Sequence, residues 1–281
     1  LPISAHAFLQ PDRESVYSAH SFAVYALATQ ATGAKAVVVP ATEGLGHDLA
    51  AMGRAVTDRT GIVWIANPNN PTGTFIAANE IKAFIDDIPH QVLVILDEAY
   101  TEYLSDSDRY SAFEWVVESP NLLVSRSFSK AYGLAGLRIG FGVAQPAIAD
   151  LLNRIRQPFN VNSLAQAAAC AALFDDVFLE QSRRVNSEGM QQLISAFNDL
   201  GLQWIPSWGN FILVKMGQAP DAGMQVFQAL LAKGVITRPV ANYGLPQWLR
   251  ISIGTREENA RCIDALSAIM PGLLPKLRAG A

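Results

Sequence analysis

The chain has few cysteines, with only Cys170 and Cys262 among its 281 residues. They lie far apart in the sequence, in segments typical of helices, so neither a disulfide framework nor a metal site is expected. We therefore expect a reducing compartment, the cytoplasm. Long apolar runs are also missing, since none approaches the roughly 20 residues of a membrane helix, and no membrane partner is expected.

Charged residues make up only 16% of the chain, whereas 50% of the residues are hydrophobic. The formal net charge of −4 at pH 7 gives no reason to expect a nucleic-acid partner, because such proteins carry a basic surface. A chain of this length can bury a large core and divide into two domains. The composition is typical of a soluble enzyme with part of its apolar surface at a subunit interface.

Short strand candidates alternate with helical segments through the first half of the chain, and most of these candidates are apolar throughout. The predicted strands are residues 15–19, 34–39, 61–66, 91–96, 121–126 and 137–143. Strands that are apolar on both faces and alternate with helices predict an α/β fold with a mostly parallel sheet covered by helices.

The pattern changes after Pro158, where long helical segments precede shorter strands. The predicted helices are residues 163–174, 177–200, 222–233 and 257–269, and the predicted strands are residues 211–216, 235–238 and 248–253. This order predicts a smaller α+β domain. We place the boundary inside the helix at 177–200, which gives a large domain of residues 1–180 and a small domain of residues 181–281.

Polar segments directly follow neighbouring strands of the predicted sheet. These segments are Asn67–Gly73, Asp97–Tyr100 and Ser127–Lys130. Ligands of parallel α/β sheets bind beyond the carboxyl ends of the strands. We therefore expect the three segments to converge on one site.

Lys130 lies in the stretch Ser127-Phe128-Ser129-Lys130, among small residues and shortly before glycines. A lysine becomes a nucleophile when its ammonium loses a proton, and burial or a nearby cation lowers its pKa. The stretch therefore suits a lysine that forms a Schiff base with an aldehyde cofactor. Taken alone, the tetrapeptide is better explained as a surface lysine after a strand.

Asp97 ends the most apolar of the predicted strands. A buried carboxylate needs a partner, and either a protonated pyridine nitrogen or an arginine, Arg126 or Arg138, would serve. Asn70 lies in a turn fixed by prolines, where it is either a turn residue or a donor to an oxygen on the same ring. Tyr100 could bind that oxygen too.

The ordered motifs N-P-N-N-P-T-G, D-E-A-Y, S-F-S-K and G-L-R-I-G together resemble the fold-type I pyridoxal-phosphate aminotransferases, over residues 15–269. The longer stretches D-E-A-Y-x-E-Y, S-K-A-Y-G-L-A-G-L-R-I-G and L-R-I-S-I-G-T-R-E-E-N are similar to those of histidinol-phosphate aminotransferases. The resemblance implies the cofactor pyridoxal 5'-phosphate, a homodimer, and amino transfer from histidinol phosphate to 2-oxoglutarate in histidine biosynthesis.

The resemblance also implies the cofactor contacts. Lys130 would carry the cofactor and move the substrate's proton, and Asp97 would pair with the pyridine nitrogen. Asn70 and Tyr100 would bind the phenolic oxygen. Phe22 would stack on the ring in place of the family's usual tyrosine. The phosphate anchors would be Ser127, Ser129 and Arg138, the arginine because its planar fork meets phosphate with paired hydrogen bonds.

Three further residues match the family's substrate contacts. Arg250 would grip the anionic group of the substrate, and Arg238 would help with a substrate phosphate. Asn210 fits a substrate loop. From the residues alone, Arg238 is as well explained by a surface salt bridge, and Asn210 is better explained as a turn residue before a strand.

Other functions stay open at this point. An aromatic amino-acid aminotransferase and a threonine-phosphate decarboxylase overlap with the same motifs, and a pyridoxal-phosphate-binding sensor domain of a transcription regulator would keep the lysine without turnover. Family members carry, before the position of Leu1, a glycine-serine-acid loop for the cofactor phosphate and a tyrosine that reaches the partner subunit. Neither is found in residues 1–281, so we expect that the N-terminal part of the family's chain is absent from this sequence.

Overall fold

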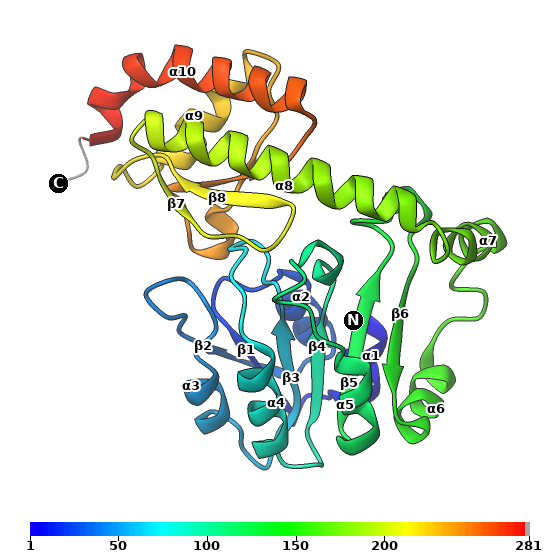
Figure 1. Cartoon of the computed structure of the whole chain (residues 1–281). Coiled ribbons are helices and arrows are strands. Elements are labelled where there is room, and N and C mark those ends of the chain that lie inside the picture. Colours follow the sequence, from blue (N-terminus) through cyan, green and yellow to red (C-terminus); the bar gives the residue numbers. More distant parts are fainter. Residues whose placement is uncertain (279–281) are drawn as a thin grey trace.

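A six-stranded sheet forms the lower part of the molecule in Figure 1, which shows the computed structural model; the structure describes residues 1–278. The strand order is β2-β1-β3-β4-β5-β6, parallel except for β6, which runs antiparallel to β5. The strands are β1 (Glu14–Ser18), β2 (Lys35–Val39), β3 (Thr60–Ala66), β4 (Leu93–Asp97), β5 (Leu122–Ser127) and β6 (Gly140–Ala144). The predicted mostly parallel sheet is confirmed.

Helices cover both faces of this sheet. They are α1 (Pro2–Phe8), α2 (Val24–Ala31), α3 (Leu49–Arg54), α4 (Ala78–Asp87), α5 (Ala112–Glu118) and α6 (Pro146–Ile155). Successive residues of a strand point to opposite faces. Val63 and Ile65 therefore pack with residues of α3, α4 and α5, and Ile62 and Trp64 pack with residues of α1, α2 and α6. Two buried faces explain why β3 carries no polar residue from Gly61 to Ala66.

A four-stranded antiparallel sheet forms the upper part of the molecule. Its order is β7-β8-β10-β9, with β7 (Gln203–Ile205), β8 (Phe211–Lys215), β9 (Arg238–Pro239) and β10 (Trp248–Ser252). The helices α9 (Ala222–Leu231) and α10 (Arg256–Arg278) accompany it. Ile212, Val214 and Leu249 form a core with Phe197 of α8 and Leu266 of α10. The predicted smaller α+β unit is therefore present as a separate sheet with its own core.

The helix α8 (Asp176–Asp199) follows α7 (Ser163–Ala172) and runs along both units in Figure 1. Its first part is fixed to the larger unit, because Ser182 Oγ donates to Ala131 O at 3.0 Å and Arg183 Nε donates to Glu102 O at 2.7 Å. The division at residue 180 falls inside this continuous helix and stays a prediction, and residues 279–281 of the predicted small domain lie outside the described residues.

Some element predictions were wrong in detail. The strand predicted at 137–143 begins only at Gly140, because Ala135–Leu137 form a 3-10 turn and Arg138 is left-handed at φ 56. The strand predicted at 235–238 is reduced to Arg238–Pro239, and α5, α6 and β7 were not predicted. Asp48 caps α3, since its carboxylate accepts a hydrogen bond from Ala51 N at 2.8 Å. No helix among residues 1–278 is both long and apolar enough to cross a membrane.

Candidate active site

A cavity of about 590 Å³ lies at the carboxyl ends of β3, β4 and β5. All the residues predicted to contact the cofactor line it: Phe22, Asn70, Asp97, Tyr100, Ser127, Ser129, Lys130 and Arg138. They come from distant segments of the chain, since Phe22 and Arg138 are 116 positions apart. The parallel register that places Ala66 beside Asp97, and Asp97 beside Ser125, brings the strand ends to one edge.

Asp97 is the last residue of β4 and is buried. The hydroxyl of Tyr25 donates a hydrogen bond to Asp97 Oδ2 at 2.9 Å. Burial raises the pKa of the Asp97 carboxyl, and this hydrogen bond opposes the shift. Among residues 1–278, Asp97 forms no ion pair, so the alternative of a structural pair with Arg126 or Arg138 is not what the structure contains. Its carboxylate is available to a cationic ring nitrogen.

Tyr25 holds Asp97 from a rigid position. Its ring is fully buried and stacks on Trp64 at 5.0 Å between centroids, while Phe22 packs edge-on against it at 5.9 Å. Tyr25 was not predicted from the sequence, because no local pattern links it to Asp97, which is 72 positions away.

Lys130 follows β5 and is half-buried. Its Nζ lies 5.2 Å from the centroid of the Tyr100 ring. Burial lowers the pKa of the Lys130 ammonium, and the guanidinium groups of Arg250 and Arg138 lower it further. These causes are the ones that make a lysine amine nucleophilic.

The loop after β3 carries Asn70 into the cavity. Asn67 fixes the loop at its base, since its amide nitrogen donates to Ile76 O at 3.0 Å and its amide oxygen accepts from Ile76 N at 2.8 Å. Gly73 has φ +80 and contacts the smaller unit so closely that a Cβ there would lie 2.2 Å from Ser207 Oγ. Only glycine suits this position.

Arg250 joins the smaller unit to this loop. Its Nη1 donates to Asn70 Oδ1, and its guanidinium lies 5.0 Å from the centroid of the Phe211 ring. Its Nε is buried and has no partner among residues 1–278. Arg250 thus presents a buried donor beside the cavity, with a charge that needs an anion.

The other predicted substrate residues lie apart from the cavity. Arg238 is exposed and stands directly opposite Arg250 across the β9–β10 pair. Asn210 lines a separate cavity of about 250 Å³ together with Tyr103 and Ser182. The structure therefore does not bring Asn210 to the cofactor cavity, and Arg238 reaches it only as a neighbour of Arg250.

The predicted phosphate anchors Ser127, Ser129 and Arg138 all line the cavity. Ser129 N donates to Ser127 Oγ at 3.0 Å, which fixes the turn after β5. Arg138 has a left-handed backbone, and its Nη1 donates to Ala135 O at 2.9 Å, so other guanidinium N–H groups stay free to bind. Hydroxyl and guanidinium donors of this kind bind a phosphate group.

A buried charge cluster behind the cavity was also not identified from the sequence. Arg126 Nη2 lies 2.8 Å from Glu98 Oε2, and Arg126 Nη1 lies 3.7 Å from Glu102 Oε1. Burial raises the pKa of Glu102 to about 7. Arg126 lines the cavity too, so this cluster supports the segment that carries Asp97 and Tyr100.

The residues present fit pyridoxal phosphate. The cavity offers a half-buried lysine with a lowered pKa, a buried carboxylate without a cationic partner, an aromatic ring at Phe22, and phosphate donors at the end of β5. Within the described residues, Arg250 Nε adds a buried donor that has no hydrogen-bond partner.

Comparisons with known proteins agree with this geometry. The model of the family described as aminotransferase class I and II matches residues 3–266. The chain is 58% identical over 270 residues to histidinol-phosphate aminotransferase 2 of Ralstonia nicotianae, which covers 96% of this chain and 72% of that protein. It is 58% identical over 266 residues to histidinol-phosphate aminotransferase 1 of Cupriavidus pinatubonensis, which covers 95% of this chain and 70% of that protein.

A solved structure shares the fold. Histidinol-phosphate aminotransferase from Sinorhizobium meliloti, in complex with pyridoxal-5'-phosphate, superposes with a TM-score of 0.91 at 29% sequence identity. The superposition covers 97% of this chain and 74% of that one.

Proposed function

Because the chain belongs to the aminotransferase class I and II family, we propose that it is the transaminase that moves the amino group of histidinol phosphate to 2-oxoglutarate in histidine biosynthesis. The observation that carries the proposal is the meeting of Lys130, Asp97 and Asn70 at adjacent strand ends of one cavity. The relatives with 58% identity, both histidinol-phosphate aminotransferases, support the choice of substrate.

The enzyme uses pyridoxal phosphate, which, when bound, acts as a sink for the electrons released at the α-carbon of the amine. Ser127, Ser129 and Arg138 would hold its phosphate, and Phe22 would stack on its ring. Asp97 would accept a hydrogen bond from the ring nitrogen and favour its protonated form. These assignments rest on the lining of the cavity and on the chemistry of each side chain.

Lys130 would move the substrate's proton through its Nζ. The lowered pKa of this amine leaves a larger neutral fraction at neutral pH, which is the form that accepts a proton. The Tyr100 ring, whose centroid lies 5.2 Å from Nζ, would limit the positions that the Lys130 amine can occupy. Tyr25 would keep Asp97 in its orientation through the 2.9 Å hydrogen bond.

Arg250 would bind the anionic end of the substrate. Its contact with Asn70 places the guanidinium next to the residue that would bind the phenolic oxygen of the cofactor. The substrate's anionic group and the cofactor ring would therefore bind at neighbouring residues. Arg238, opposite Arg250 in the neighbouring strand, would add charge for a substrate phosphate.

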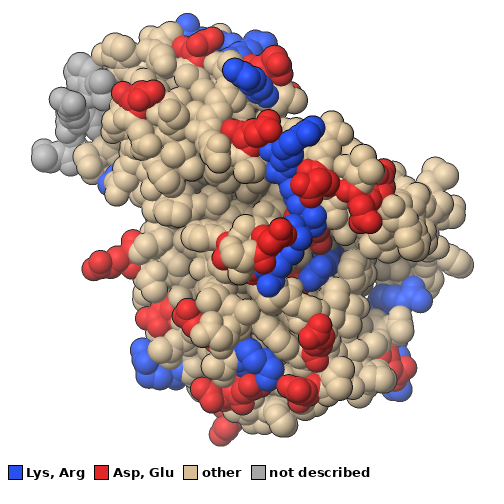
Figure 2. All heavy atoms as spheres, in the orientation of Figure 1, with Lys and Arg blue, Asp and Glu red and all other residues tan. Residues whose placement is uncertain are grey.

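We further propose a homodimer in the cytoplasm. The segment before α7, the start of α7 and the turn into α8 expose large apolar side chains: Phe159, Leu164, Phe174 and Val177. Figure 2 shows mainly uncharged side chains over α7 at the right edge. A second copy covering this surface would explain the exposed apolar area, and sedimentation velocity tests it. The free thiols of Cys170 and Cys262 suit a reducing compartment.

Steady-state turnover of the holoenzyme tests the function. Histidinol phosphate, phenylalanine and threonine phosphate are each offered with 2-oxoglutarate, and the proposal predicts the highest kcat/KM for histidinol phosphate. Faster turnover of phenylalanine would indicate an aromatic aminotransferase, and carbon dioxide release from threonine phosphate would indicate a decarboxylase. A sensor domain would turn over none of the three.

A further inference from the structure

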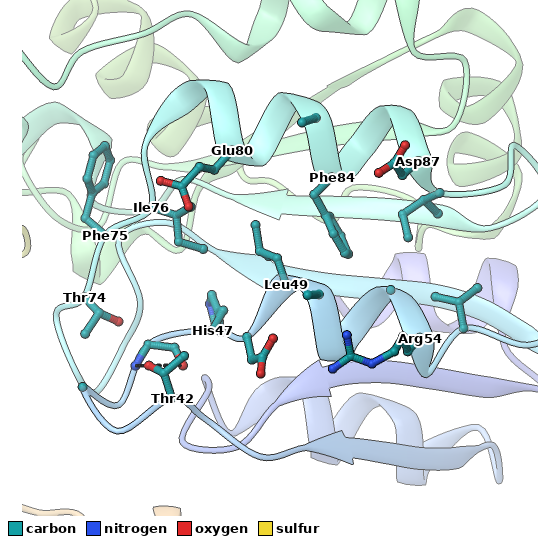
Figure 3. A pocket seen from close by; sticks show the side chains of 18 of the residues that line it. Thr42, His47, Leu49, Arg54, Thr74, Phe75, Ile76, Glu80, Phe84 and Asp87 are labelled. Atoms are coloured by element: carbon teal, nitrogen blue, oxygen red, sulfur yellow. Dashed lines mark hydrogen bonds between the residues drawn. The ribbon is translucent and has the colours of Figure 1, made fainter.

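A second cavity, of about 1130 Å³, lies beside the loop that carries Asn70. Thr74, Phe75 and Ile76 of that loop line it, together with residues of α3 and α4. The smaller unit contributes Ile205, Pro206 and Trp208. The second cavity shares no lining residue with the cofactor cavity, which is lined on this loop by Pro68 and Asn70. Figure 3 shows it between α3 and α4. Nothing in the proposed mechanism uses this cavity.

His47 is the most deeply buried polar group in its wall. The side chain is 8% exposed, and its Nε2 donates to Ala66 O at 3.0 Å. Burial lowers the pKa of His47 to about 4, so the ring is neutral at pH 7 and its Nδ1 carries a lone pair. Nδ1 is buried and has no partner among residues 1–278. A buried acceptor of this kind costs free energy until a donor binds it.

The charged residues in the lining are mainly acidic. The acids are Asp48, Glu80 and Asp87, and the one base is Arg54. Across the described part of the chain, none of them takes part in an ion pair. Acidic side chains that are free of basic partners make the cavity attractive to a cation.

Figure 3 shows that the polar groups lie at two ends. Thr42, Thr74, His47 and Glu80 lie toward one end, and Arg54 and Asp87 lie toward the other. Arg54 can offset only one of the three acids in the lining, so the cavity carries an excess of negative charge, to which the carboxylate of Glu80 contributes. Leu49 and Phe84 lie between the two ends and offer an apolar surface. A mostly apolar cavity with a few convergent polar groups is the usual form of a small-molecule site.

We propose that this cavity binds a small organic cation, an amine or amidine on a flat apolar body. An N–H of the cation donates to His47 Nδ1, and its charge faces Glu80. The apolar body packs against Leu49, Ile76 and Phe84. The site is separate from the transaminase site, and its occupant is not consumed.

Benzamidine is a suitable probe, because it carries a cationic amidine on a benzene ring and has no amino group on a tetrahedral carbon that could be transferred. Isothermal titration of the pyridoxal-phosphate holoenzyme should show one benzamidine per chain, with benzamide binding more weakly and benzoate not at all. His47→Phe and Glu80→Gln should each raise the Kd for benzamidine. The increase should be roughly tenfold for His47→Phe, which loses a hydrogen bond to the charged amidine.

Glu43→Gln is the matched control, since Glu43 is an exposed acid near Thr42 that does not line the cavity. It should leave benzamidine affinity unchanged. Glu80 is exposed on α4, so Glu80→Gln keeps the test valid even if His47→Phe fails to fold. The proposal is overturned if benzamidine does not bind at millimolar concentration, if benzoate binds as well as benzamidine, or if Glu80→Gln and Glu43→Gln bind benzamidine equally well.

Discussion

The guanidinium of Arg250 donates a hydrogen bond to the side-chain oxygen of Asn70, across 180 positions of sequence. Arg250 lies in the central part of the antiparallel sheet, and Asn70 lies in the loop after β3 of the parallel sheet. One contact therefore ties the proposed substrate-binding residue to the proposed cofactor-binding residue. A change at Arg250 removes this contact between the two units.

Arg250→Ala should lower kcat/KM for histidinol phosphate by an amount equivalent to about 2–3 kcal/mol of transition-state binding, because a charge-assisted contact to an anion is lost. The loss should be much smaller for an uncharged amine offered in a half-reaction. Arg261→Ala, at an exposed arginine of α10, is the control and should change neither rate. Equal losses for both amines would show that Arg250 holds the fold and does not recognise the substrate.

Asp97→Asn should keep pyridoxal phosphate bound but slow turnover by at least about 100-fold, because the ring nitrogen loses its anionic partner. The visible spectrum measures cofactor binding, and the rate of the half-reaction with histidinol phosphate measures the chemistry. Turnover at the wild-type rate would exclude this role for Asp97.

Tyr25→Phe should move the acid limb of the kcat/KM profile to higher pH. The hydroxyl of Tyr25 lowers the pKa of Asp97 against the effect of burial, so its removal raises that pKa. Asp97 is then deprotonated only at higher pH, and activity at the acid end is lost first. An acid limb at the wild-type position, with cofactor still bound, would mean that Tyr25 does not position Asp97.

Glu102→Gln should change how stability depends on pH. Burial raises the pKa of Glu102 to about 7 in the folded protein, above the value of about 4.3 in an unfolded chain. Between these values the folded state binds more protons than the unfolded state, so wild-type stability falls as pH rises. Relative to Glu102→Gln, the wild-type free energy of unfolding should fall by up to about 3 kcal/mol between pH 5 and pH 8.

Denaturant unfolding of the two apoproteins at several pH values measures this difference. Glu114→Gln, at an exposed glutamate of α5, serves as control and should follow the wild type. If the wild type and Glu102→Gln keep a constant difference from pH 5 to pH 8, Glu102 does not titrate in that window.

The architecture could be predicted because β3 and β4 are buried on both faces. Their apolar runs have no polar position, and such runs between helices indicate a parallel sheet. The family predicted from the ordered motifs is also confirmed. The start of β6 could not be predicted, because the left-handed backbone of Arg138 interrupts an apolar run that otherwise looks like strand.

The cavity residues that directly follow strands could be predicted from the sequence. Contacts between segments that are distant in the sequence could not. Tyr25 and Asp97 are 72 positions apart, and Arg126 is 28 positions from Glu98. No local pattern links such pairs, since only the folded register brings them within hydrogen-bond distance. The same holds for Asn210, which shares its separate cavity with Tyr103 and with residues of α8.

Lys130 is the residue on which the proposed chemistry depends, and borohydride reduction tests it most directly. The holoenzyme is reduced, digested and mapped by mass spectrometry, with Lys130→Ala as the control. The account predicts the phosphopyridoxyl group on Lys130 Nζ alone, and no labelled peptide from Lys130→Ala. A label on another lysine, or a label that persists in Lys130→Ala, would contradict it.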